Sequence, residues 1–248
     1  MLTEQSAYAN RWRRVSPVAK GLFSLCGMIA AFAAGSPHAA LLAACLISAA
    51  TVFGAGVAVT NYLRVAIPPL IFLTASTLSL LVSLDFGSSL TGVSLHLAKT
   101  GLPHITLTCS RSLACLSALL FLVLTTPLSD CISLLRRCKV PETLLDMMTL
   151  CYRTLFVLSE AVHDTMTAQS SRLGYTTVAG SLRSLGGLVS NLIVQVWQRS
   201  LALHNAAEAR GNDGALRFLE NSYANSQLSV CIAIVSGCLM IALTIILP

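Results

Sequence analysis

Two short motifs carry the residues of this sequence that are best suited to specific chemistry. Each places one arginine between a small residue and a glycine: the first reads Ser171, Arg172, Leu173, Gly174, and the second reads Ala209, Arg210, Gly211. A guanidinium group presents a rigid, planar set of donors that can form two hydrogen bonds with one carboxylate. Small neighbours leave room for the backbone of another protein. The two motifs therefore predict docking points for an acidic surface rather than catalytic groups.

Both motifs also fit the ordinary end of a helix. Glycine readily adopts the left-handed conformation that ends many helices, so we expect Gly174 and Gly211 to hold the two stop positions. An arginine just before the stop complements the negative end of the helix dipole, which is worth about 0.3–1 kcal/mol. Capping would explain one such motif alone, but its repetition after two neighbouring helical segments favours docking.

Each motif follows a long amphipathic segment. The first segment opens at Pro141, where a missing backbone N–H costs no helical hydrogen bond. Its apolar residues alternate steps of four and three, at Leu144, Met148, Cys151, Leu155, Leu158, Val162 and Met166. The second segment repeats the pattern at Leu182, Leu185, Val189, Leu192, Val196 and Leu203. The spacing predicts two helices, the first of about 30 residues and about 45 Å, whose apolar stripes pack on each other as an antiparallel or crossed pair.

The uncharged run 184–198 in the second segment allows another interpretation. Arg183 and Arg199 flank it as cationic residues flank membrane spans. Fifteen residues that include serine, asparagine and glutamine are short and polar for a span, and a run of this length is more often a buried helix. A span here would also reverse the side of the membrane on which the C-terminus lies.

The composition is that of an integral membrane protein. Of 248 residues, 55% are hydrophobic and 10% are charged, and the mean hydropathy is +0.76. Charge is concentrated: residues 130–220 contain nine Lys or Arg and eight Asp or Glu, whereas residues 221–248 contain none. We therefore expect three domains, namely a membrane block at 1–129, a cytoplasmic domain of amphipathic helices at 130–227 and a last membrane span at 228–248.

Apolar runs predict an all-α protein with about five transmembrane helices. They lie near 18–35, 39–59, 65–83, 108–128 and 228–247. We interpret the basic N-terminal segment as a cytoplasmic flank rather than a signal peptide, which places the charged domain inside and the C-terminus outside. Of sixteen Lys and Arg, only Lys99 and Arg111 then fall on the outer side. Leu90, Val93 and Leu97 predict a short surface helix in the outer loop.

The sequence contains no catalytic, cofactor or metal motif. H-E-x-x-H, G-x-S-x-G and the phosphate-binding G-x-x-x-x-G-K-[ST] are absent, so we expect no enzyme activity and no ATP hydrolysis by this chain. The five histidines are scattered, and the nine cysteines contain no C-x-x-C pair. The formal charge of +6 is spread along the chain, which fits cytoplasmic flanks of a membrane protein better than nucleic-acid binding.

An ordered set of short motifs runs through the charged domain. It comprises Thr126-Pro127, Val140-Pro141, Tyr152-Arg153, Ala168-Gln169, Arg172-Leu173-Gly174-Tyr175 and Glu208-Ala209-Arg210-Gly211. On these motifs the sequence resembles the CbiQ/EcfT family, the transmembrane coupling component of energy-coupling factor (ECF) ABC transporters, and its cobalt or nickel branch in particular. The match covers about 125–214, while the first four spans and the last match only in pattern.

The resemblance implies an L-shaped, multi-pass protein of the bacterial inner membrane. Its cytoplasmic coupling helices would sit on two ABC-type ATPases, and its membrane part would hold a separate substrate-binding subunit (the S component), possibly with a small accessory membrane subunit. Ser171, Arg172, Gly174, Ala209, Arg210 and Gly211 would form the two ATPase-coupling motifs. Cobalt and nickel both stay open, because another chain would choose the ion.

The first motif departs from the commoner Ala-Arg-Gly pattern of the family. It has Ser171 in place of alanine and an inserted Leu173, so the residue at which the helix stops stays open. Two other functions also stay open from the residues alone: a membrane scaffold or channel subunit of another transporter, and an integral-membrane enzyme that modifies lipids.

Overall fold

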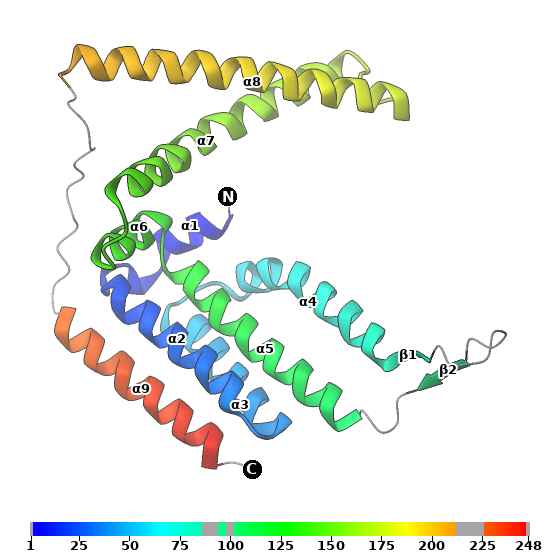
Figure 1. Ribbon diagram of the computed structural model, residues 1–248, viewed down its shortest axis with the longest axis vertical. Coiled ribbons are helices and arrows are strands. Elements are labelled where there is room, and N and C mark those ends of the chain that lie inside the picture. The colour runs from blue at the N-terminus through cyan, green and yellow to red at the C-terminus, as the bar shows by residue number, and fades with distance from the viewer. Residues whose placement is uncertain (1, 86–93, 98–101, 212–225, 247–248) are drawn as a thin grey trace. The chain divides into compact units, whose positions relative to one another are not determined.

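The protein is almost entirely helical. A computed structural model describes residues 2–85, 94–97, 102–211 and 226–246 (Figure 1). The helices are α1 (Leu2–Ala9), η1 (Arg11–Arg14), α2 (Pro17–Ala33), α3 (Pro37–Ala49), η2 (Ala50–Gly54), α4 (Val59–Leu81), α5 (Leu102–Thr125), α6 (Leu128–Arg137), α7 (Glu142–Ser171), α8 (Val178–Ala209) and α9 (Ser226–Ile246). Two short strands, β1 (Val82–Asp85) and β2 (Ser94–Leu97), pair antiparallel. Apart from this small pair, the fold is the predicted all-α membrane protein.

The chain divides into two compact units. The membrane unit consists of Met1–Cys131 with Asn221–Pro248, and the helix-pair unit consists of Ile132–Glu220. Among the described residues, four helices are long and apolar enough to cross a membrane, at Pro37–Gly54, Val59–Leu80, Pro103–Thr125 and Gln227–Ile246. They match the last four predicted spans.

The first predicted span corresponds to α2, which is shorter. With 17 residues it is about 25 Å long, against the ~30 Å of a bilayer core. It packs along α9 and α5 in the membrane unit. Both α2 and α3 begin with a Ser-Pro pair, in which the serine hydroxyl accepts from the backbone N–H three residues on and the proline occupies the first turn.

Small residues allow the helices of the membrane unit to approach closely. Ala30 and Ala31 of α2, Ala44 of α3 and Ala114 and Ala118 of α5 are all buried. Many large apolar side chains, such as Leu25, Ile29 and Phe72, are exposed on the outside of this unit, as expected for contact with lipid. The helix α4 runs unbroken through the two prolines at 68 and 69.

The predicted surface helix in the outer loop is wrong where it can be assessed. Leu97 lies in β2, opposite Val82 of β1. Leu90 and Val93 lie outside the described residues. Three apolar residues in a short loop are too few for their spacing to distinguish a helix from a strand, and pairing with β1 decides at Leu97.

The helix-pair unit is built on α7 and α8, which have 30 and 32 residues. The 30-residue length expected for the first amphipathic helix is therefore confirmed. The predicted packing of the two apolar stripes is not, because the helices meet near their connection and separate beyond it (Figure 1). Leu155 of α7 and Leu182 and Val189 of α8 are all exposed. Each helix buries a single residue, Leu145 or Leu188.

Candidate functional site

The two motif arginines occupy the same position in their helices. Arg172 is the C-cap of α7 and Arg210 is the C-cap of α8, with φ angles of −94° and −95°. The N–H of Arg172 donates to the carbonyl of Gln169 at 3.2 Å, and the N–H of Arg210 donates to that of Ala207 at 3.1 Å. Both arginines are exposed. Within the described part of the chain, neither guanidinium forms an ion pair. Two equivalent, accessible cations therefore end the two longest helices.

The residue after each arginine has a left-handed backbone conformation, with positive φ. Gly211 has φ +68°, as predicted, but in the first motif it is Leu173, with φ +58°, that takes this conformation rather than Gly174. The N–H of Leu173 donates to the carbonyl of Ser170 at 3.0 Å, and that of Gly174 donates to the carbonyl of Gln169 at 2.9 Å. These two bonds form a complete Schellman motif. The inserted Leu173 therefore leaves Arg172 at the C-cap. Leu173 takes the position in the first motif that Gly211 takes in the second.

Gly174 is needed for a different reason, namely close approach between the helices. A Cβ atom at this position would lie 2.6 Å from the hydroxyl oxygen of Ser184 and 3.0 Å from the carbonyl oxygen of Gln169. That Ser184 hydroxyl donates a hydrogen bond to the carbonyl of Gly174 at 2.9 Å. Absence of a side chain at Gly174 thus lets the second turn of α8 bind the end of α7 directly.

A neutral hydrogen-bonded clamp completes the connection. The side-chain amide of Gln169 donates to the carbonyl of Ser184 at 3.0 Å, and its oxygen accepts from the hydroxyl of Tyr175 at 2.6 Å. Thr177 caps α8 by accepting from the N–H of Gly180 at 3.1 Å. The sequence motifs include Gln169 and Tyr175 but do not indicate a structural role for either residue. Their role is to hold the segment that carries Arg172, and no local pattern indicates that Ser184 is their partner.

The second motif is held more simply. The N–H of Gly211 donates to the carbonyl of Glu208 at 2.9 Å, and the carboxylate of Glu208 lies 3.4 Å from the imidazole of His204 one turn earlier. Both of those side chains are exposed, so this pair adds little stability. Around the first motif, Leu173 and Val178 are 72% and 90% exposed, which places apolar surface beside the Arg172 cation.

No set of three or more His, Cys, Asp or Glu side chains among the described residues lies close enough to hold a metal ion. Both helix ends present an exposed guanidinium, and the first also presents the exposed apolar side chains of Leu173 and Val178.

The same region of the sequence matches a known family. Residues 9–219 match the family model of CbiQ, described as a cobalt transport protein, and this range includes both arginine motifs. The chain belongs to the CbiQ cobalt transport protein family. The predicted resemblance is thus confirmed, and the CbiQ family is one of membrane transport components, in agreement with the four long apolar helices.

Curated relatives are similar over most of this chain. The cobalt transport protein CbiQ of Rhodobacter capsulatus is 31% identical over 91% of this chain and 90% of its own. That of Salmonella typhimurium is 29% identical over 79% of this chain and 90% of its own. A putative fused cobalt transport protein CbiMQ of Methanocorpusculum labreanum is 28% identical over 88% of this chain, which spans 38% of that longer protein.

Proposed function

We propose that this protein is the transmembrane coupling subunit of an ECF-type ABC importer for cobalt or nickel ions. It transmits ATP-driven motion from two cytoplasmic ATPases to a separate substrate-binding membrane subunit and catalyses no reaction itself. The observation that supports this function most is the equivalent presentation of Arg172 and Arg210, each exposed, at the C-cap of a long helix and without an ion-pair partner among the described residues.

The arginines are the docking groups for the ATPases. Each guanidinium enters an acidic groove and pairs with a carboxylate there, while the small residues Ser171 and Ala209 before it and the left-handed residue after it keep the helix end slim. Gly174 and Gly211 complete the two coupling motifs. Loss of one partner of a buried, hydrogen-bonded charge pair costs about 2–5 kcal/mol, which weakens binding roughly 30-fold or more.

The helix pair transmits the displacement because its connection is stiff. Gln169, Ser184 and Tyr175 tie α7 to α8 through three side-chain hydrogen bonds, counting the one to Gly174. Movement of an ATPase that holds Arg172 therefore moves both helices together, over about 45 Å of α7. Such rigid-body movement of packed elements is a common way to convert nucleotide binding into motion.

The exposed apolar side of α8 is the surface for a further partner. Ile193 and Trp197 are more than 60% exposed, on the uncharged segment between Arg183 and Arg199, and Leu182 just before that segment is exposed as well. Extended apolar surface of this kind indicates a protein or membrane contact. In our proposal the substrate-binding subunit covers it, with a small accessory membrane subunit nearby, so the run does not have to span the bilayer as a helix of its own.

The family and its relatives support cobalt as the transported ion, and nickel shares its ligand chemistry. The ion is held by the substrate-binding subunit. The fused relative, whose name joins CbiM to CbiQ, supports a second membrane component that works next to this one. In this proposal the protein lies in a bacterial inner membrane. The distribution of Lys and Arg supports an orientation with the N-terminus and residues 130–227 in the cytoplasm and the C-terminus outside.

The test reverses the charge of both arginines. Arg172→Glu and Arg210→Glu together should release the ATPases when the complex is purified by a tag on this chain, and should abolish uptake of radioactive cobalt or nickel by cells. Arg183→Glu is the matched control, because Arg183 is also an exposed arginine of α8 but lies outside the motifs. Retained ATPases and normal uptake in the double variant would refute the function, as would uptake in cells that lack the ATPases.

A further inference from the structure

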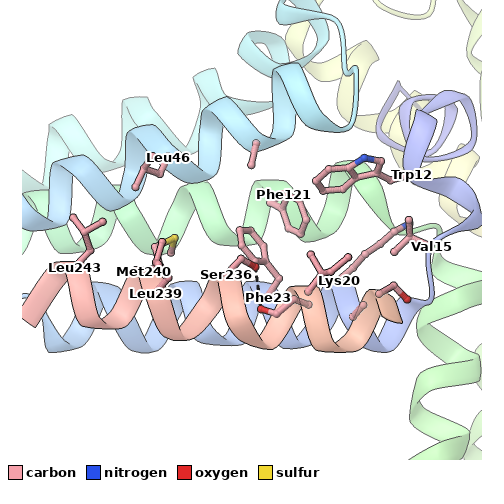
Figure 2. Close-up of a pocket in the computed structure, with 15 residues that line it drawn as sticks. Trp12, Val15, Lys20, Phe23, Leu46, Phe121, Ser236, Leu239, Met240 and Leu243 are labelled. Atoms are coloured by element: carbon pink, nitrogen blue, oxygen red, sulfur yellow. Dashed lines mark hydrogen bonds between the residues drawn. The ribbon is translucent and has the colours of Figure 1, made fainter. Parts of the chain in front are cut away.

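An apolar groove of about 460 Å³ lies within the membrane unit, between α2, α3, α5 and α9 (Figure 2). Its wall is almost entirely carbon, with Phe121, Met240 and Leu243 among the residues that line it. Figure 2 shows Trp12 and Lys20 toward one end of the groove and Leu243 at the other. The groove therefore has two chemically different ends.

The polar end contains a buried cation. Only 3% of Lys20 is exposed, and its ammonium donates a hydrogen bond to the carbonyl of Thr125 at 2.8 Å. An ammonium has three protons, so this single bond leaves donors for another oxygen. Asp130 is buried too, and its charge attracts the ammonium. The groove thus has a charged hydrogen-bond donor at one end, whereas the Ser236 hydroxyl further along the wall is neutral and donates to the Ala233 carbonyl.

The same end carries the features of a membrane–water interface. Trp12 packs edge-on against Phe121, with ring centroids 6.0 Å apart, and its indole lies so close to Gly54 that a Cβ there would be 2.7 Å from a ring carbon. Arg11 and Arg13 on either side of Trp12 are exposed. Tryptophan and arginine together are typical of headgroup depth, where basic residues attract anionic lipids.

The groove runs along a membrane-crossing helix. Its wall on α9 extends from Ser229, whose hydroxyl lies 3.4 Å from that of Ser16, to Leu243. This stretch is about 21 Å long at 1.5 Å per residue, somewhat more than one half of a ~30 Å bilayer core. A lipid chain that begins at the polar end would lie along this stretch, through one leaflet and slightly beyond it.

The volume of the groove fits a single hydrocarbon chain. If a methylene group takes about the ~30 Å³ of a water molecule, the groove holds about 15 of them. A helix 21 Å long and ~10 Å wide would need roughly 1,600 Å³, so a helix of another subunit does not fit inside. We infer that the groove binds one acyl chain of an anionic phospholipid, with its phosphate at the end that Lys20 lines, where the neighbouring basic segment contains the exposed Arg11 and Arg13. This inference concerns the membrane unit alone and does not depend on the ATPases.

Trp12 reports directly on this site. The chain has two tryptophans, so Trp197→Phe leaves Trp12 as the only one. The full-length variant is placed in nanodiscs of phosphatidylcholine that contain a small mole fraction of phosphatidylglycerol with brominated acyl chains, which quench tryptophan fluorescence on contact. We expect brominated phosphatidylglycerol to quench Trp12 at about fivefold lower mole fraction, or less, than brominated phosphatidylcholine.

Two substitutions on α9 locate the bound chain. Ser236→Phe fills the groove and should remove the preference, whereas Val235→Phe places the same ring on the exposed side of α9 and should leave it unchanged. Lys20→Gln should keep quenching but reduce the preference for the anionic lipid. The double variant Arg11→Gln with Arg13→Gln should reduce the same preference without altering a buried side chain. Equal quenching by both lipids, or a preference that survives Ser236→Phe, would overturn the proposal.

Discussion

Substitution of Gly174 by alanine tests how the first coupling motif is held. The added methyl group would lie 2.6 Å from the Ser184 hydroxyl and 3.0 Å from the Gln169 carbonyl. The hydroxyl can rotate away, but it then loses its hydrogen bond to the Gly174 carbonyl, which is worth about 0.5–1.5 kcal/mol. The Gln169 carbonyl belongs to the helix backbone and must shift. Together these effects should destabilise the connection by about 1–3 kcal/mol.

A double-mutant cycle separates the two causes. Ser184→Ala removes the hydroxyl that the new methyl group meets, so Gly174→Ala and Ser184→Ala together should cost less than the sum of the two single changes, by about 1 kcal/mol. Gly186→Ala is the matched control on α8, since a Cβ there meets nothing within 4 Å. It should be neutral or stabilise the helix by up to about 1 kcal/mol.

The assay for these variants is hydrogen exchange of the full-length protein in detergent, read at peptides that cover 169–184. Gly174→Ala should speed exchange there about 5- to 100-fold, and ATPase attachment through Arg172 should weaken in parallel. Unchanged exchange in Gly174→Ala, or costs that add in the double variant, would refute the view that Gly174 is required for contact with Ser184.

Two further predictions concern the membrane unit. Arg111→Leu should lower thermal stability, because the Arg111 guanidinium donates two hydrogen bonds, at 2.7 and 3.2 Å, to the Ala34 carbonyl at the end of α2. The free energy of unfolding should fall by about 1.5–3 kcal/mol. An unchanged melting temperature would contradict this role. Burial, with a smaller contribution from Asp130, raises the pKa of the Cys131 thiol. Since the thiolate is the reactive form and is depleted at pH 8, alkylation of Cys131 should be slower than that of exposed Cys138 and should keep rising at higher pH; equal rates would contradict it.

Much of the fold could be predicted because membrane spans and amphipathic helices are local patterns. Four predicted spans coincide with long apolar helices, and Pro141 precedes a helix of the expected 30 residues. The two arginines were found in the same way, from small residues and glycine beside them, and both lie at helix C-caps. A local pattern could not choose between helix and strand at Leu97, where pairing with Val82 decides.

The sequence by itself determined the class of protein, the family and the position of both arginines, since length, hydropathy and short motifs depend only on neighbours along the chain. Only the tertiary structure decided that Leu173 rather than Gly174 is left-handed, because the demand for glycine at 174 comes from Ser184, ten residues further on. It also decided that the apolar stripes of α7 and α8 stay largely exposed, and it assembled a lipid-sized groove from four helices. Contacts between distant residues set these features, and no periodicity within one helix encodes them.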